Sequence, residues 1–137
     1  MTLQVELVSP ERVLLSVDAS RVIARTIGGG DIAFLTGHAP FIGALDTWPL
    51  EILCADDHVE LAAVHGGFIS VSDDQVKILS DVAELAGQID VARAEAARER
   101  AEAAMPSGDE ARGSAAAADL ARANARLAVA TARTAAH

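Results

Sequence analysis

Residues 79–93 read LSDVAELAGQIDVAR, and the character of the chain changes within them. Before this stretch, apolar residues come in short runs and alternations that glycine, proline and aspartate interrupt. After it, the chain is rich in alanine and shows no strand pattern. The sequence therefore predicts two unlike parts, an N-terminal antiparallel β-sandwich over residues 1–86 and a C-terminal two-helix antiparallel hairpin over residues 87–137.

The first part is expected to consist of short strands. Leu3, Val5 and Leu7 alternate with polar residues, which is the period of a strand with one buried face. Further strands are predicted over residues 13–17, 21–26, 32–35, 41–45, 48–54, 59–64, 68–71 and 75–79. Turn signals at intervals of roughly 8 to 12 residues are typical of an antiparallel sandwich. Trp48 and the three phenylalanines are expected to fill its core.

The second part is expected to be helical, because 20 of its last 49 residues are alanine and its basic residues are all arginine. Asp90 is a predicted N-cap. The stretch 105–108, Met-Pro-Ser-Gly, ends the first helix, and Ser107 with Glu110 fits a capping box for a second helix over roughly residues 109–134.

The predicted hairpin has few large apolar residues with which to dock on the sandwich. A buried CH₂ group contributes about 0.8 kcal/mol, so a face of alanines gains much less than a face of leucines. We therefore expect a hairpin that docks marginally and can detach. Its larger apolar residues are Ile89, Val91, Met105, Leu120, Leu127 and Val129.

The net charge of −9 lies entirely in the first part. Residues 1–88 carry thirteen acidic and four basic residues, whereas residues 89–137 carry seven of each. This balance argues against nucleic-acid binding. No apolar run suggests a membrane span and no signal peptide is recognisable. Cys54 is the one cysteine, so no internal disulfide is expected and a cytosolic protein is the default.

No constellation of residues indicates that the chain is an enzyme. Residues 28–30, Gly-Gly-Gly, lack the lysine and the helix of a phosphate-binding loop. The aspartate pairs at 56–57 and 73–74 suit turns, and no nucleophile elbow occurs. No metal site is predicted, because the histidines show no ligand spacing: they are His38, His58, His65 and His137.

The arginines of the second part allow two interpretations. Arg93 and Arg100 share one helix face, and Arg122 and Arg126 share another, so four guanidinium groups could converge in a hairpin. The alternative is a solvated face with ion pairs such as that between Arg98 and Glu102. Spacing alone favours the solvated face.

Three motifs resemble the epsilon subunit of F-type ATP synthases. They are GDIAFLTGHAP at residues 30–40, VHGGFISV at residues 64–71, and VKIL at residues 76–79 followed by the alanine-rich hairpin. The resemblance runs from Val5 to about Val129. The chain departs from it at residues 33–36, where Ala-Phe and then threonine stand in place of the usual glycine, small aliphatic residue and proline.

The resemblance implies a non-catalytic rotor subunit in a proton-translocating ATP synthase. In this family the sandwich binds the gamma subunit and the membrane rotor ring, completing the central stalk that couples ion flow to ATP synthesis. The hairpin either lies folded on the sandwich or extends along gamma to the catalytic alpha and beta subunits and blocks ATP hydrolysis. The implied location is the cytoplasmic face of the cell membrane, peripherally bound.

The resemblance also implies a regulatory ATP, although no cofactor is required. Some bacterial members bind ATP through an Ile/Leu-Asp-x-x-Arg-Ala motif. The residues that match this motif or the family's other nucleotide-contacting positions are Glu84, Ile89, Asp90, Arg93, Ala94, Arg100, Arg122 and Arg126. Arginine forks suit phosphate oxygens, and a carboxylate suits the adenine amino group.

A function of a different class is a free-standing sensor of a nucleotide or another small ligand. Such a protein would use the same sandwich and arginine-lined hairpin without a rotary partner. It predicts no affinity for a gamma subunit.

Overall fold

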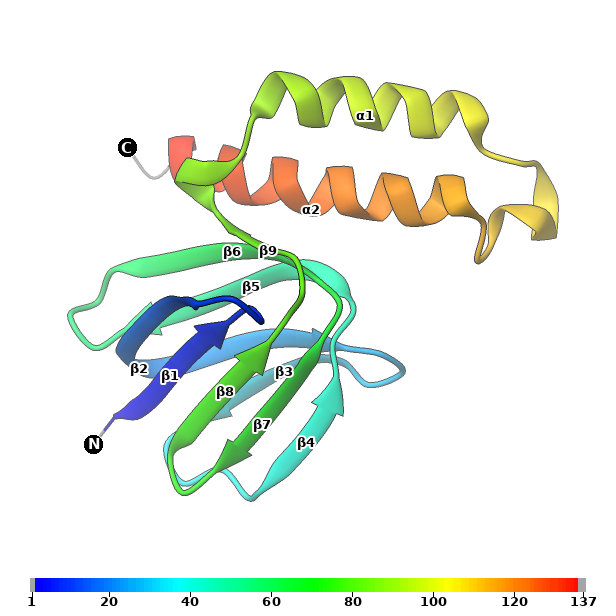
Figure 1. Cartoon of the computed structure of the whole chain (residues 1–137). Helices are drawn as coiled ribbons and strands as arrows, with labels where there is room; N and C mark the ends of the chain where they lie inside the picture. Colours follow the sequence, from blue (N-terminus) through cyan, green and yellow to red (C-terminus); the bar gives the residue numbers. More distant parts are fainter. Residues whose placement is uncertain (1, 136–137) are drawn as a thin grey trace.

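The structure is a computed structural model that describes residues 2–135, with side chains from 2 to 132. Two layers of β-strands pack face to face, and two antiparallel helices lie beyond one end of them (Figure 1). The second helix, α2, lies between the first helix, α1, and the sandwich. The predicted fold class, a β-sandwich followed by a helical hairpin, is confirmed.

Nine strands form one continuous hydrogen-bonded sheet within the described residues, and eight of them follow a single path. The order is β4-β7-β8-β1-β2-β5-β6-β9, and β3 pairs with β2 outside this path. All pairs are antiparallel except β1 with β8, which is parallel. The strands are β1 Leu3–Val8, β2 Val13–Thr26, β3 Gly30–Leu35, β4 Phe41–Ala44, β5 Thr47–Cys54, β6 Val59–His65, β7 Phe68–Ser72, β8 Gln75–Leu79 and β9 Ala83–Leu85.

The long strand β2 belongs to both layers of the sandwich. Residues 13–19 pair with β1, and residues 19–26 pair with β5 and β3. The register shifts between Ala19 and Arg21, where a bulge turns the strand from one layer into the other. The prediction of two separate strands, 13–17 and 21–26, was therefore wrong, because the chain stays extended between them. A bulge and a turn favour the same polar residues, so the sequence did not distinguish the two.

The core between the layers is complete without the helices. Its buried residues all come from the strands or the connections between them: Leu3, Val5, Leu7, Ala19, Val22, Ala24, Phe34, Leu45, Leu50, Ile52, Cys54, Ala62, Val64, Ile69, Val71, Val76 and Ile78. Among the aromatic residues, Phe34 is fully buried and packs against Phe41 with ring centroids 5.4 Å apart.

Trp48 and Phe68 correct the prediction that all four large aromatic residues fill the core. Trp48 is 42% exposed, since it stands at the start of β5, and its ring stacks on Arg25 at 3.4 Å. Phe68 is 60% exposed, because its neighbour Ile69 takes the inward position on β7. Both side chains therefore belong to the surface.

The helices begin and end as follows. The short 3₁₀-helix η1 spans Ala86–Gln88, α1 spans Val91–Ala104, η2 spans Gly108–Ala111 and α2 spans Ala115–Ala135. Asp90 caps α1 as predicted, because its Oδ1 accepts from the backbone N–H of Arg93 at 3.1 Å.

The start of α2 differs from the prediction. Ser107 makes no side-chain cap, and α2 begins six residues later than expected, at Ala115. The cap is Ser114, whose Oγ accepts from the N–H of Ala117 at 3.1 Å. Gly113 explains the delay, because its φ of 75° is left-handed and a right-handed helix cannot include it.

Candidate functional site

The contact between α2 and the sandwich includes a cluster of few large apolar side chains, built mainly from alanine and valine. Ala63 of β6 is buried with Ala125 and Val129 of α2, and partly buried residues surround them: Leu61, Ala86 and Ile89. Helix α1 in turn packs on α2 through buried alanines, among them Ala94 and Ala101. The prediction of few large apolar contacts is therefore confirmed for the docked position.

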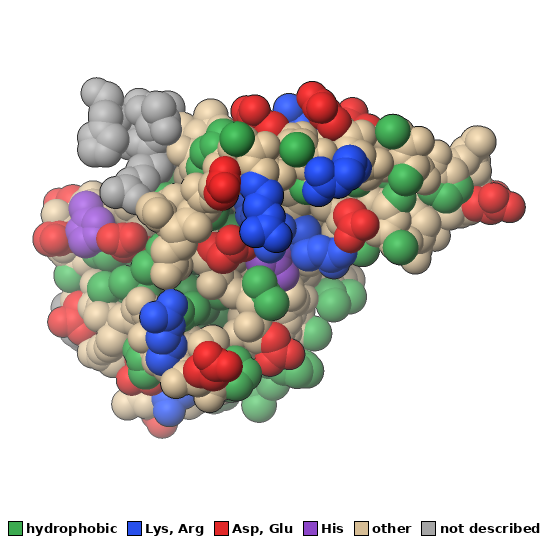
Figure 2. Space-filling model, turned by 45° about the horizontal axis from the view of Figure 1, so that its top comes forward, with side chains coloured by type: hydrophobic (Ala, Val, Ile, Leu, Met, Phe, Trp, Pro, Cys, Tyr) green, Lys and Arg blue, Asp and Glu red, His purple; other side chains and the backbone are tan. Residues whose placement is uncertain are grey.

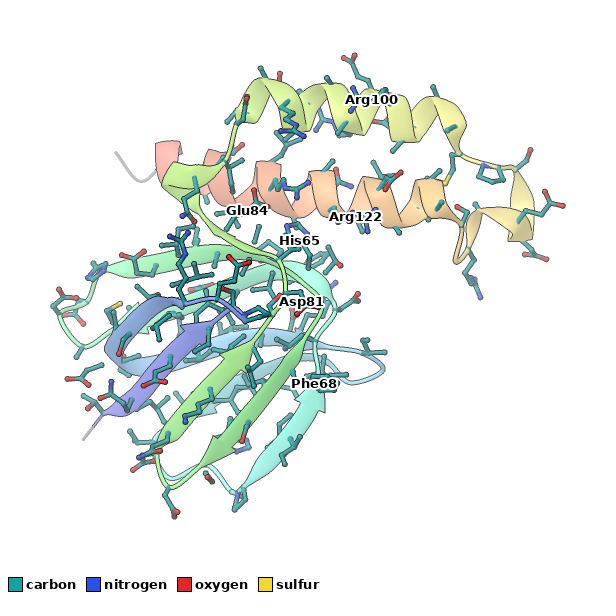
Figure 3. The ribbon with its side chains drawn as sticks, in the orientation of Figure 1. His65, Phe68, Asp81, Glu84, Arg100 and Arg122 are labelled. Atoms are coloured by element: carbon teal, nitrogen blue, oxygen red, sulfur yellow. The ribbon has the colours of Figure 1, made fainter. Side chains whose placement is uncertain are left out.

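A charged group lies beside this contact. The Oε1 atom of Glu84, on β9, accepts from Arg126 Nε of α2 at 2.6 Å and lies 3.0 Å from His65 Nε2 of β6. Figure 3 shows Glu84 and His65 at the end of the sandwich that faces α2. Only about a quarter of each charged side chain is exposed, with 25% for Glu84 and 28% for Arg126. The pair therefore joins the hairpin to the sandwich.

His65 is the buried member of this group, with 3% of its side chain exposed. Burial lowers its pKa, against a raising effect from Glu84 and with a further lowering effect from the charges of Arg126 and Arg122. A hydrogen on Nε2 would donate to the Glu84 carboxylate. The Nδ1 atom of His65 is buried and has no hydrogen-bond partner among the described residues.

A pocket of about 340 Å³ opens beside Glu84 between the sandwich edge and the two helices. Five of its lining residues are charged, and Figure 2 shows Lys or Arg and acidic side chains gathered over this part of the helices. The lining residues are Glu84, Gln88, Asp90, Arg93, Ala97, Arg100 and Arg126. A second hollow of about 380 Å³ continues from it past Arg100 and Arg126 to Arg122.

Two of these arginines have uncommitted guanidinium groups. Among the described residues, no carboxylate pairs with the side chain of Arg93 or Arg100. By contrast, Arg126 pairs with Glu84 and Arg122 pairs with Asp119. The pocket therefore offers two arginines without a carboxylate partner, beside the Glu84–Arg126 ion pair. Such an arrangement suits a polyanion.

The structure brings most of the predicted site residues together. Glu84, Asp90, Arg93, Arg100 and Arg126 line the same pocket, and Arg122 lies in the adjoining hollow.

The other two predicted residues do not line the pocket. Ile89 packs against the cluster under α2, and Ala94 is buried in the helix pair. Both side chains pack within the interior of the hairpin and its dock. The Asp90 carboxylate caps α1, which places Arg93 at the pocket wall.

Sequence reasoning missed His65 and Gln88. Gln88 lines the pocket, and its Oε1 accepts from the N–H of Leu85 at 2.9 Å. His65 reaches Glu84 because β9 pairs with β6, where Ala63 lies opposite Glu84. Strand β9 was not predicted, so no sequence pattern placed the two side chains together.

A second surface of interest is apolar and lies on the outer face of β4, β7 and β8. Phe68 pairs directly with Leu79, and Ile42 lies on the neighbouring strand β4 opposite Ser70. These three side chains are 60%, 51% and 79% exposed. Figure 3 shows Phe68 on a part of the sandwich away from the helices.

Comparison with known proteins decides the family. The model of the ATP synthase delta/epsilon chain β-sandwich domain matches residues 2–86. An ATP synthase epsilon chain of Streptomyces griseus is 47% identical over 97 residues, which cover 71% of this chain and 77% of the relative. The chain belongs to the ATP synthase epsilon-chain family. It is thus a non-catalytic subunit, as predicted.

Other relatives of this family agree. The epsilon chain of Brevibacillus brevis is 47% identical over 95 residues, covering 69% of this chain and 71% of the relative. The fold resembles a chain in the Euglena gracilis mitochondrial ATP synthase, solved as an OSCP/F1/c-ring assembly, with a TM-score of 0.70 and 23% identity over 99% of this chain and 82% of that one. A chain of the Tetrahymena thermophila central stalk and c-ring gives a TM-score of 0.52 at 17% identity, covering 98% and 97%.

Helices that could cross a membrane are absent from the described residues. Neither α1 nor α2 combines the necessary length with sufficient apolar character.

Proposed function

We propose that this epsilon-family chain is a central-stalk rotor subunit whose helical hairpin regulates ATP hydrolysis. The observation that supports regulation is the asymmetry of the two parts. The sandwich core contains no helix residue. The docked hairpin, by contrast, is held by a contact made mainly of small side chains and by the Glu84–Arg126 pair. An element held this weakly can leave its dock without unfolding the domain beneath it.

The sandwich supplies the attachment to the rotor in this proposal. Phe68, Leu79 and Ile42 form an exposed apolar surface on one sheet face. Such a surface on a folded domain usually marks a protein interface. The partners that membership in the family suggests are the gamma subunit and the membrane rotor ring, which would place the chain at the cytoplasmic face of the cell membrane.

The pocket under the hairpin is the proposed site of a regulatory ATP. Arg93 and Arg100 would donate to phosphate oxygens, and Arg126 would add a third donor on the facing helix. The adenine amino group would donate to an acidic side chain of the pocket, Glu84 or Asp90. Because the ligand would touch β9, α1 and α2 at once, bound ATP would stabilise the docked hairpin.

The experiment that tests the rotor role is binding of the purified chain to its cognate catalytic head, with gamma present and the resident epsilon chain removed. Native mass spectrometry should show one bound copy, and the hydrolysis rate should fall. Phe68→Ser should weaken this binding more than Val59→Ser, a matched loss of an exposed apolar side chain at the β5–β6 tip. Absence of binding would instead favour a free-standing nucleotide sensor.

A further inference from the structure

The connection between β5 and β6 is a tight turn that places unusual side chains together. Cys54 N–H donates to His58 O at 2.8 Å, and Asp57 N–H donates to Cys54 O at 2.9 Å. Since Leu53 pairs with Val59, Cys54 and His58 are the next opposed residues and share one face of the hairpin. Asp57 takes a left-handed φ of 72°, which lets the chain reverse within this short turn.

Three different ligand types meet on that face. The Cys54 sulfur, one Asp56 carboxylate oxygen and one His58 ring nitrogen all lie within 4.8 Å of one another. Asp56 Oδ1 is 2.5 Å from His58 Nδ1 and also accepts from the His58 backbone N–H at 3.3 Å. The turn itself therefore gathers these atoms, and only small side-chain adjustments separate them from a common centre.

The far side of the His58 ring is held by a further carboxylate. Its Nε2 lies 3.0 Å from Glu60 Oε1 on β6. A metal-binding histidine usually donates its second ring N–H to a carboxylate, which fixes the tautomer and orients the metal-facing nitrogen. Glu60 occupies that position here, and it leaves Nδ1 directed toward Asp56.

We propose that Cys54, Asp56 and His58 bind one divalent cation of the zinc class at the tip of the β5–β6 hairpin. A sulfur, nitrogen and oxygen set suits borderline-soft Zn²⁺, whereas Mg²⁺ and Ca²⁺ prefer six or more oxygens. On binding, the thiol proton leaves to solvent as the sulfur–metal bond forms, and the thiolate and carboxylate balance the two positive charges.

The surroundings define how the ion would enter and what completes its shell. Cys54 is buried at 2% exposure, while the side chains of Asp56 and His58 are 71% and 50% exposed. The cation therefore approaches from the solvent side and meets the sulfur last. Three protein ligands leave a fourth tetrahedral position for water or for a donor from another molecule.

A simpler account of the same contacts is a protonated His58 held between Asp56 and Glu60. In that account Cys54 is a core residue only and its sulfur takes no part in binding a cation, so a test of the sulfur distinguishes the two accounts. The full-length chain, freed of metal by a chelator, should be titrated with Co²⁺ as a spectroscopic probe and then with Zn²⁺. We expect one equivalent of Co²⁺ to produce a thiolate-to-cobalt charge-transfer band, which Zn²⁺ then removes.

Neighbouring aspartates provide a matched control. Asp56→Asn removes a ligand, whereas Asp57→Asn makes the same change in charge at a residue outside the set and keeps a side chain that tolerates left-handed φ. We expect Asp56→Asn to weaken Co²⁺ binding at least about tenfold and Asp57→Asn to leave it within about threefold, since tenfold corresponds to about 1.4 kcal/mol. Cys54→Ser should abolish the charge-transfer band.

Two results would overturn the proposal: a parent titration without a thiolate band, or equal affinities for the two asparagine variants. If Cys54→Ser does not fold, the comparison of Asp56→Asn with Asp57→Asn still tests the proposal. Both aspartates are exposed, so neither substitution should disturb the core. Glu60→Gln should weaken binding less than Asp56→Asn, since Glu60 contacts the ring and not the ion. None of these measurements depends on the rotor role or on ATP binding.

Discussion

Arg126 and Glu84 are 2.6 Å apart and form the one ion pair that joins the hairpin to the sandwich among the described residues. Both are partly buried, so the pair is stronger than an ion pair in free solvent, for which about 0–1 kcal/mol is usual. We expect a coupling energy of about 1.5–3 kcal/mol, typical of a hydrogen bond to a charged group.

A double-mutant cycle with Arg126→Ala and Glu84→Gln measures this coupling. Native-state hydrogen exchange of α2 should speed up in either single variant, while exchange in the sandwich core should not change. Arg98→Ala serves as the control, because Arg98 pairs with Glu102 within α1. Additive effects of the two substitutions would show that the pair does not hold the hairpin.

Stability should fall below neutral pH because of His65. Its pKa in the unfolded chain is near 6.5, and burial lowers this pKa in the folded chain. Glu84 of β9 raises the pKa, whereas the charges of Arg126 and Arg122 on α2 lower it further. Between these two pKa values the unfolded state binds more protons, so stability is full above about pH 6.5 and declines as pH drops toward the folded pKa.

This contribution can be isolated by comparing the parent with His65→Gln between pH 8 and pH 5. The parent should lose more free energy of unfolding than the variant. His58 acts in the opposite direction, because hydrogen bonds to Asp56 and then Glu60 raise its pKa, but it is common to both proteins and cancels. Parallel pH curves for the two proteins would contradict the prediction.

ATP binding should depend on the two arginines without carboxylate partners. Arg93→Ala and Arg100→Ala should each weaken ATP binding by the isolated chain about tenfold, the effect of losing one charge-assisted hydrogen bond. Arg98→Ala removes the same charge from the same helix but not from the pocket, so it should have little effect. Isothermal titration would refute the site if all three variants bound equally.

Removal of the hairpin should separate the two proposed roles. A chain ending at residue 88 retains the entire sandwich core, so it should fold and still bind the catalytic head. Hydrolysis by that complex should exceed hydrolysis with the full chain, because the inhibitory element is gone. Circular dichroism of the shortened chain provides the folding control, and an unchanged hydrolysis rate would remove the regulatory role.

Gly67 should tolerate no side chain. Its φ is 117°, and a Cβ atom there would lie 2.0 Å from the carbonyl oxygen of Leu79. We expect Gly67→Ala to cost about 3 kcal/mol or more, from strain plus overpacking against backbone. Gly66→Ala, at φ 83° with 3.9 Å of clearance from Leu45 O, should cost only about 1 kcal/mol, and urea unfolding compares the two.

The features that local patterns determine were predictable from the sequence. Alternating strands, the Asp90 cap and the alanine-rich hairpin each depend on residues close together in the chain. The resemblance to the epsilon family then predicted that the arginines and Glu84 belong to one site. Spacing alone favoured a solvated face for the arginines.

The features that tertiary contacts determine were not predictable. The three-residue strand β9 is too short to show a period, so the His65–Glu84 contact was missed. Trp48 lies two residues before the buried Leu50, so the alternation along β5 predicts that its side chain points into the core. It lies at the exposed end of the strand instead. Cys54 and His58 meet only because the turn is tight, which their separation in sequence does not reveal.

The parallel pairing of β1 with β8 bears on how the chain is made. Gln4 lies beside Gln75, so β1, which also pairs with its neighbour in sequence β2, gains its second partner only when β8 has been synthesised near the end of the sandwich. Such distant pairings slow folding, because the intervening loop must close before the contact forms. The hairpin emerges after β8, and it therefore finds its dock on a sandwich whose strands are already available to pair.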